Sequence, residues 1–255
     1  MSHTGDRERG GNLSEIFVSY QGEGSHAGQK HLFVRFAGCN IRCRYCDTPE
    51  SLTRVASYTI DYPMGGHQRR ANPVTTAELA AVVEEVCRQD SGIAMLAITG
   101  GEPMVQAGFL NTWLRDHPPS LPCLLETNAT LADGMGDLID RLSVVSADVK
   151  LPSNSGERGL WEEHRRFLKA CSSGVELYVK VPVDGATRPE EVAAAARLLR
   201  ETVPAAKLFL QPVTELVSGR WQIVESRLLE LLACAAAEMP VVGLMPQMHK
   251  LWGVK

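Results

Sequence analysis

Three cysteines mark the stretch of this sequence whose residue types and spacing could do chemistry. Cys39, Cys43 and Cys46 follow the spacing C-x3-C-x2-C, and a loop this short can turn all three sulfurs toward one metal centre. A structural zinc site is closed by four protein ligands, and a 4Fe-4S cluster normally takes four thiolates. Three cysteines without a nearby fourth ligand therefore indicate a cluster in which one iron stays open to a small molecule.

Two other interpretations of these cysteines are a disulfide-linked loop and a zinc-binding loop. The chain has 7 cysteines, an odd number, and those outside the loop are scattered in apolar or helical surroundings. That pattern is not a disulfide framework, and it is typical of the reducing cytoplasm, where we expect this protein. The scattered thiols are expected to be small buried hydrophobic groups; they are Cys87, Cys123, Cys171 and Cys234.

A glycine-rich motif follows the apolar strand that we expect at Ile93 to Thr99. The motif reads T-G-G-E-P from Thr99. Its glycines allow the backbone to approach a ligand closely, and Glu102 can accept a hydrogen bond from an ammonium group. Alone it is a common turn. After a strand and a three-cysteine loop, it resembles the G-G-E-P motif of the radical S-adenosylmethionine (SAM) enzymes.

The resemblance to the radical SAM superfamily implies two cofactors. In that superfamily the open iron of a 4Fe-4S cluster chelates the amino and carboxylate groups of SAM. Reduction of the cluster then cleaves SAM to a 5′-deoxyadenosyl radical. The resemblance assigns the cluster to Cys39, Cys43 and Cys46, and it assigns the methionine end of SAM to Gly101 and Glu102.

A longer pattern narrows the resemblance to one family. The run E-I-F-x-S-x-Q-G-E-G from Glu15, followed by F-V-R-F-A-G-C-N-x-R-C-x-Y-C-D-T from Phe33, is similar to the 7-carboxy-7-deazaguanine synthases of the queuosine and deazapurine pathways. In that family the Q-G-E motif, the strand arginine, the threonine before the glycines and the histidine of a Q-x-H-K ending contact a pterin. The corresponding substrate-binding residues here are Gln21, Gly22, Glu23, Arg35, Thr99 and His249.

The same resemblance assigns a magnesium ion to Thr48, the threonine of the C-D-T motif. Oxygen ligation suits Mg2+, a hard cation that usually keeps few protein ligands and shares the rest with substrate and water. Without the family, Thr48 would be a turn residue and Arg35 could equally be a solvated charge. A lone histidine such as His249 would then be surface decoration.

The reaction implied by the family is conversion of 6-carboxy-5,6,7,8-tetrahydropterin to 7-carboxy-7-deazaguanine with release of ammonia, and SAM is regenerated in it. The implied partners are the small-molecule pterin, an external low-potential electron donor of the flavodoxin or ferredoxin type, and a second copy of the chain in a homodimer. Two alternatives stay open at this point. A glycyl-radical-activating enzyme would share the cysteines and the G-G-E-P motif but act on a protein. An iron-sulfur electron carrier or zinc-binding module would have no use for the polar motifs at the strand ends.

The order of the predicted elements indicates an α/β fold. Repeated βα units imply a parallel sheet with helices outside, and the resemblance adds that this sheet is a partial, modified TIM-type (β/α) barrel. A capping-box sequence opens a helix at Thr75. We expect strands at 93–99, 121–126, 143–150, 175–181, 207–210 and 241–244, and further helices at 189–201 and 221–238.

Polar residues at the ends of these strands predict one active-site face, because ligands of such sheets bind at the carboxyl ends of the strands. Each residue taken alone could equally be a turn residue. Ala129 follows one strand end where the family usually has glycine, and its β-carbon matters only if the backbone needs a positive φ. With the family's SAM site in view, the candidate SAM contacts beyond Gly101 and Glu102 are Tyr45, Glu126, Asn128, Ser146, Lys150 and Gln211.

Composition bounds the domain organisation and the class of partner. Residues 1–12 are polar and glycine-rich and predict a disordered tail, and residues 13–255 predict a single radical SAM domain with a variable loop at 50–73. The net charge of -4 and the pI of about 6.0 argue against nucleic-acid binding and against a polybasic membrane binder. The richest apolar run, 228–239, is interrupted by glutamates, so it indicates a core helix and no membrane span.

Overall fold

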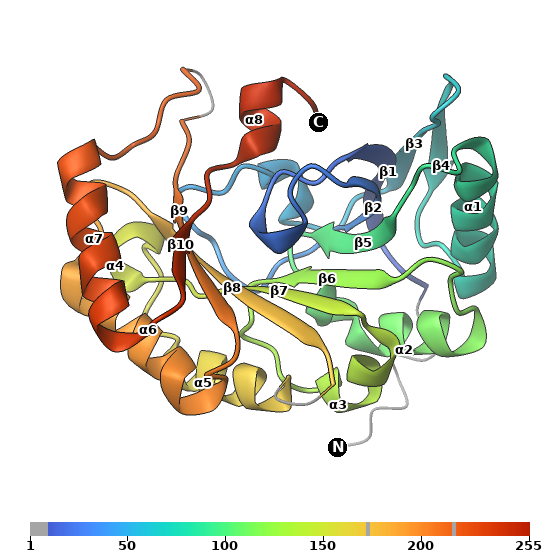
Figure 1. Cartoon of the computed structure of the whole chain (residues 1–255). Coiled ribbons are helices and arrows are strands. Elements are labelled where there is room, and N and C mark those ends of the chain that lie inside the picture. The colour runs from blue at the N-terminus through green and yellow to red at the C-terminus, as the bar shows by residue number, and fades with distance from the viewer. Residues whose placement is uncertain (1–9, 172–173, 216–217) are drawn as a thin grey trace.

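One mixed sheet organises the described part of the chain, which in this computed structural model comprises residues 10–171, 174–215 and 218–255. These residues form a sheet of ten strands in the order β10-β9-β8-β7-β6-β5-β2-β1-β3-β4 (Figure 1). The strands are β1 (Leu13–Tyr20), β2 (Lys30–Phe36), β3 (Ser57–Asp61), β4 (His67–Ala71), β5 (Met95–Gly100), β6 (Cys123–Thr127), β7 (Val144–Asp148), β8 (Glu176–Val183), β9 (Lys207–Pro212) and β10 (Val242–Leu244).

Most of the sheet is parallel. Strand β2 and strands β5 to β10 all run in the same direction. Strand β1 is antiparallel to β2, and the β3–β4 hairpin extends the sheet beyond β1. Because β10 and β4 are the two free ends of the order, the curved sheet does not close. The predicted α/β fold with a partial barrel is confirmed.

Helices cover the outer side of this sheet. Figure 1 shows α1, α2, α3, α5, α6 and α7 around the outside of the curve, whereas the short C-terminal helix α8 lies apart from them. None of the helices in the described ranges has the length and apolar composition needed to cross a membrane. The helices are α1 (Thr76–Gln89), α2 (Ala107–Asp116), α3 (Met135–Leu138), α4 (Pro152–Ser155), α5 (Trp161–Ala170), α6 (Pro189–Thr202), α7 (Glu225–Glu238) and α8 (Met248–Trp252).

Helix α1 illustrates how the sequence builds the outer layer. Its buried residues recur at helical spacing and face the sheet. The predicted capping box is present: the hydroxyl of Thr75 accepts the N–H of Glu78 at 3.2 Å, and the Glu78 carboxylate accepts the N–H of Thr75 at 2.8 Å. The apolar stripe of this helix consists of Leu79, Val82, Val83 and Val86.

A smaller apolar cluster lies on the inner face of the sheet. Phe17 and Phe33 stack with their ring centroids 5.0 Å apart, and both line the cavity described below. These two rings therefore form the part of the cluster that faces the cavity. The other members of the cluster are Met95, Ala97, Leu124, Val144 and Tyr178.

The segment 50–73 is not the loop that we predicted. It contains the β3–β4 hairpin, whose register pairs Ser57 with Ala71 and Asp61 with His67. Four of the five residues of β4 are exposed, so this edge strand lacks the apolar alternation by which a strand is recognised in a sequence. The predicted variable loop thus contains the outer edge of the sheet.

The predicted tail at residues 1–12 includes residues that belong to the fold. Gly11 exchanges backbone hydrogen bonds with Val74, both at 2.8 Å. Asn12 is buried, and its side chain accepts the N–H of Val55 at 2.9 Å while its own N–H donates to Gln106 at 2.8 Å. Residues 1–9, the rest of that prediction, lie outside the described residues.

Ala129 adopts the left-handed backbone conformation that glycine usually supplies, with φ at +54°. Its methyl group is fully buried. The left-handed conformation costs a residue with a β-carbon about 1–2 kcal/mol, whereas burying the methyl group gains about 0.8 kcal/mol. The β-carbon at this position therefore matters, and it is tolerated because burial offsets part of the strain.

We predict that Ala129→Gly changes the free energy of unfolding by less than about 1 kcal/mol, because relief of strain opposes the lost methyl group and the added chain entropy of glycine. Ala129→Val should lose at least about 2 kcal/mol through overpacking and a branched side chain at positive φ. Urea denaturation measures both. Ala196→Gly, at a buried position in helix α6, is the control and should lower the free energy of unfolding by about 2 kcal/mol. An equal loss for Ala129→Gly would show that the backbone at Ala129 is not strained.

Candidate functional site

A cavity of about 400 Å³ opens at the carboxyl ends of the parallel strands. It collects nearly all the residues that the sequence singled out, although they come from distant parts of the chain. Two candidates do not line it, Glu102 and Ser146, which lie buried nearby. Those that do are Gln21, Gly22, Glu23, Arg35, Cys39, Cys43, Tyr45, Cys46, Thr48, Thr99, Gly101, Glu126, Asn128, Lys150, Gln211 and His249.

The cysteine loop is fastened at both ends by backbone hydrogen bonds. On one side the N–H of Cys39 donates to the carbonyl oxygen of Leu52 at 3.1 Å. On the other, the N–H of Arg44 donates to the carbonyl oxygen of Ser155 at 2.9 Å, and the Arg44 guanidinium donates to that of Ser153 at 2.6 Å. Neighbouring segments therefore help to position the cysteine loop.

The thiols of Cys39, Cys43 and Cys46 are all free and partly buried. This excludes the disulfide-linked loop. Within the described ranges, no three His, Cys, Asp or Glu side chains are placed to hold one metal ion, which disfavours a zinc site. A 4Fe-4S cluster fits this donor set, because each thiolate binds a different iron and the sulfurs need not meet at one ion. Burial raises the pKa of Cys39 and of Cys43, so cluster assembly must release protons there.

The glycines of the T-G-G-E-P motif allow tight packing against the start of the cysteine loop. Gly100 has φ at +145°, and a β-carbon on it would lie 2.1 Å from the carbonyl oxygen of Phe36. A β-carbon on Gly101 would lie 2.4 Å from the carbonyl oxygen of Ser51. Any side chain at either position would therefore push the strand end away from the cysteines.

Glu102 is fully buried and its hydrogen bonds are internal. Its carboxylate accepts the N–H of Asn128 at 2.6 Å, the hydroxyl of Thr127 at 2.8 Å and the N–H of Met104 at 2.9 Å. Burial raises its pKa to about 7, although these donors counteract that rise. Glu102 thus holds the end of β6, where the side-chain amide of Asn128 approaches the sulfur of Cys39 at 3.9 Å. The contact between Glu102 and SAM that the sequence indicated stays a prediction.

We predict that Glu102→Ala lowers the free energy of unfolding by about 3 kcal/mol or more, because it leaves three buried donors without an acceptor at about 1–3 kcal/mol each. Urea denaturation of the purified protein measures the loss. Glu84→Ala, on the exposed side of helix α1, serves as the control and should stay within about 0.5 kcal/mol of the unchanged protein. A similarly small loss at Glu102 would show that these hydrogen bonds do not support the fold.

The loop Gln21–Glu23 is joined to both the sheet and the C-terminal segment. The side-chain amide of Gln21 donates to Glu126 at 2.8 Å, and the carbonyl oxygen of Gly22 accepts the N–H of Met248 at 2.9 Å. A β-carbon on Gly22 would lie 2.2 Å from the imidazole of His249. Glycine at this position therefore allows His249 to reach the cavity.

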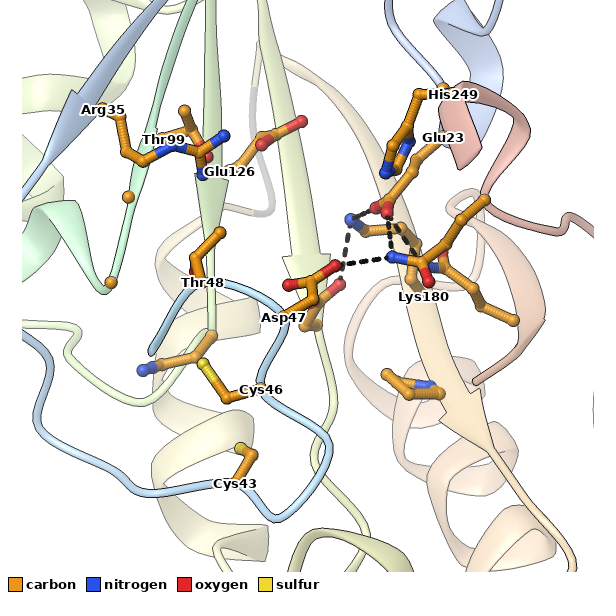
Figure 2. A pocket seen from close by; sticks show the side chains of 18 of the residues that line it. Glu23, Arg35, Cys43, Cys46, Asp47, Thr48, Thr99, Glu126, Lys180 and His249 are labelled. Atoms are coloured by element: carbon orange, nitrogen blue, oxygen red, sulfur yellow. Dashed lines mark hydrogen bonds and ion pairs between the residues drawn. The ribbon is translucent and has the colours of Figure 1, made fainter. Parts of the chain in front are cut away.

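Buried charges of alternating sign cross the cavity wall. The ammonium group of Lys180 pairs with Glu23 and, at 3.2 Å, with Asp148, and Lys150 pairs with Asp148 at 2.8 Å. Burial would lower the pKa of both lysines, but the carboxylates outweigh it and hold these pKa values well above the usual range. Figure 2 shows Glu23, Lys180 and His249 on one side, with Arg35, Thr99 and Glu126 across from them.

A second set of contacts connects the cysteine loop with the C-terminal segment. The side-chain amide of Gln247 donates to both Glu23 and Asp47 at 3.0 Å, and Lys250 donates to Asp47 at 3.0 Å. Burial would raise the pKa of Asp47, but the charge of Lys250 holds it below the usual value. Sequence reasoning missed Asp47, Lys180 and Gln247; two of these lie inside recognised motifs, C-D-T and Q-x-H-K, which could have indicated them.

Arg35 faces the cavity, so it is not a solvated edge charge. Its Nε donates to the carboxylate of Glu15 at 2.8 Å, and its guanidinium lies 5.5 Å from the ring centroid of Phe17. Its side chain is 17% exposed. At the cysteine end, the ammonium group of Lys150 lies 5.5 Å from the ring centroid of Tyr45.

Comparisons of the sequence with known proteins identify relatives along most of the chain. The radical SAM superfamily matches residues 33–210. A 7-carboxy-7-deazaguanine synthase of Geobacter sulfurreducens is 34% identical over 247 residues, which cover 96% of this chain and 98% of that protein. One of Methanopyrus kandleri is 36% identical over 256 residues, which cover 97% of each chain.

Comparisons of the structure agree on the fold. QueE from Escherichia coli superposes with a TM-score of 0.59 at 20% identity, over 97% of this chain and 100% of that one. A radical SAM methyltransferase from Sphaerobacter thermophilus superposes with a TM-score of 0.56 at 13% identity, over 91% of this chain and 77% of that one. At these identities the likeness shows the partial barrel and nothing about substrates.

Proposed function

Because this chain belongs to the radical SAM superfamily, and within it to the 7-carboxy-7-deazaguanine synthases, we propose how its cavity residues serve that enzymatic activity. When bound, a 4Fe-4S cluster and SAM supply the radical chemistry. One observation carries the assignment: the three free cysteines and the loop Gln21–Glu23 line the same cavity. A substrate held by that loop would therefore lie within reach of the cofactors.

The substrate in this proposal is 6-carboxy-5,6,7,8-tetrahydropterin, which has a carboxylate at one end and a row of hydrogen-bonding groups at the other. The guanidinium of Arg35 suits the carboxylate by its fork of donors. Gln21 and Glu23 would read the hydrogen-bonding edge of the ring, with Thr99 and His249 against its periphery. Glu126, which bonds to Gln21, fits this group better than the SAM group to which its position in the sequence assigned it.

The SAM end of the cavity lies beside the cysteines in this proposal. Tyr45 and Lys150 form one wall, and Gly101 lines the same cavity. Ser146 and Glu102 would act from beneath, because neither lines the cavity. The remaining proposed SAM contacts are Asn128 and Gln211.

We propose that Thr48 binds the magnesium ion through its hydroxyl oxygen. A single protein oxygen suits Mg2+, which usually keeps several waters and shares the rest of its coordination with the substrate. Thr48 lines the cavity and follows Cys46 by two residues. An ion held there would orient and polarise the substrate.

The partners follow from the same assignment. The exposed Arg42 and Arg44 beside the cysteines suit an acidic electron donor of the flavodoxin or ferredoxin type. Exposed apolar side chains on or next to α7, β10 and α8 support a homodimer, and they are Leu229, Val241, Leu244, Leu251 and Trp252. Light scattering should give twice the chain mass of 27.8 kDa, and a monomer at micromolar concentration would contradict the dimer.

The decisive experiment is anaerobic turnover. The protein with reconstituted cluster is mixed with dithionite, SAM, Mg2+ and the carboxytetrahydropterin, and the products are analysed by mass spectrometry. We expect 7-carboxy-7-deazaguanine. Formation of 5′-deoxyadenosine without the deazaguanine would refute the substrate, and an absence of SAM cleavage on a loaded cluster would refute the assignment of the cysteines.

We predict that Arg35→Ala raises KM for the pterin at least about tenfold, because a hydrogen bond to a charged group contributes about 1.5–3 kcal/mol and 1.4 kcal/mol is a factor of ten. Arg35→Lys should recover only part of the loss, since an ammonium group cannot form the fork. Steady-state kinetics measure both. Arg54→Ala, which changes an exposed arginine, is the control and should leave KM unchanged. Normal pterin turnover by Arg35→Ala would show that Arg35 does not bind the substrate.

A further inference from the structure

Lys180 is a buried charge in the cavity wall to which the assignment above gives no task. Its side chain is 5% exposed, although it lines the cavity. A buried ammonium group is costly unless it is paired. Lys180 pairs with Glu23, which comes from the substrate loop, and with Asp148, which comes from the end of β7. It therefore joins the loop that would read the substrate to the rigid sheet.

Among the described residues, the donors around Glu23 leave one of its acceptor positions free. An ionised carboxylate has about four lone-pair sites. Its Oε1 accepts the side-chain amides of Gln211 and Gln247, both at 3.0 Å, and its Oε2 accepts the ammonium group of Lys180. Every one of these partners is a donor. Glu23 therefore has an acceptor site left to offer, on the same oxygen that Lys180 holds.

Lys180 also keeps this carboxyl charged. Burial would raise the pKa of Glu23, but the charges of Lys180 and His249, with hydrogen bonds from Lys180 and Gln247, hold it well below the usual range. Without Lys180 the effect of burial would grow relative to the rest, and a proton on Oε2 would turn the free position from an acceptor into a donor. The other titratable groups facing Glu23 or Lys180 are Asp47, Glu126, Asp148 and Tyr178.

We propose that Lys180 is a positioning residue that sets substrate specificity. Its ammonium group fixes Glu23 as a carboxylate that only accepts, so that the site binds a ring edge presenting an N–H at that point and rejects one presenting an oxo group. The inference rests on the proposed contact between Glu23 and the substrate. In a pterin the 2-amino group is such a donor, and in a lumazine an oxo group takes its place.

The test compares two ligands that differ at this one group. Anaerobic holoenzyme with cluster and SAM is titrated with 6-carboxypterin and with 6-carboxylumazine, and ligand fluorescence gives both Kd values. We expect the unchanged protein to prefer the pterin by about tenfold to a hundredfold, the range expected for a hydrogen bond to a charged acceptor. Lys180→Met should reduce this preference at least about tenfold at pH 5.5, and the preference should recover as a rising pH ionises Glu23.

A merely structural role for Lys180 predicts a different result. Loss of packing would weaken both ligands equally and leave the ratio of their Kd values unchanged, which would overturn the proposal. Lys30→Met is the matched control, because Lys30 pairs with Asp90 at 3.0 Å outside the cavity; it should not alter the ratio.

Two further variants separate this inference from the assignment of Glu23. If Glu23→Gln leaves both Kd values unchanged, Glu23 does not touch the substrate and that assignment fails on its own. If Glu23→Gln removes the preference for the pterin, the double variant Glu23→Gln, Lys180→Met should not change the ratio of the two Kd values any further. A further change in this ratio in the double variant would show that Lys180 acts directly on the ligand and would overturn the proposal.

Folding of the single variant need not decide the outcome. Lys180→Met leaves Glu23 without its paired cation, although Asp148 keeps Lys150. The double variant removes the Glu23–Lys180 pair together, a change that buried ion pairs often tolerate. In addition, the unchanged protein alone is informative. Its Kd ratio should stay constant between pH 5.5 and 7.5, and a preference for the pterin that vanishes toward pH 5.5 would show that Lys180 does not keep Glu23 ionised.

Discussion

The structure of the cavity depends on pairing charges that are buried away from water. Each ion buried in a protein costs several kcal/mol unless an opposite charge and hydrogen bonds compensate it. Here Glu23, Lys180, Asp148 and Lys150 alternate in sign and satisfy one another. The pairing requires a particular register, because Asp148 lies directly opposite Lys180 where β7 and β8 run side by side. A slip of one residue would turn one of the two side chains to the other face, so the sheet and the charge network fix each other.

Close backbone approach is the second requirement, and glycine provides it where the loops meet. Gly100 and Gly101 let the end of β5 pack against the start of the cysteine loop, and Gly22 lets the C-terminal segment pack against the substrate loop. Both contacts bring segments that carry proposed site residues close to one another. Ala129 shows the same need for a special backbone conformation, met without glycine. The strained residue directly follows Asn128, whose side-chain amide approaches the sulfur of Cys39.

Sequence reasoning succeeded where a local pattern has a single physical cause. The cysteine spacing, the T-G-G-E-P motif and the helical spacing of Leu79 and Val82 each depend on neighbours in the chain, and the strand ends then followed from the parallel sheet. It failed where partners are far apart in sequence. Lys180 lies in an apolar strand, and its role depends on two distant partners, Asp148 and Glu23, the latter 157 residues away. The β3–β4 hairpin was missed because its outer strand is polar and is stabilised by pairing and not by burial.

The C-terminal segment joins the two ends of the cavity into one unit. Gln247 donates to Glu23 and to Asp47 through the same amide nitrogen, both at 3.0 Å. Asp47 lies between Cys46 and Thr48, so one side chain connects the substrate loop with the residues proposed to hold the cluster and the magnesium ion. Movement of α8 would therefore disturb both ends together, and neither end can be altered without a change in the hydrogen bonds of the other. An arrangement of this kind suits a reaction in which two cofactors and a substrate must be aligned before chemistry begins.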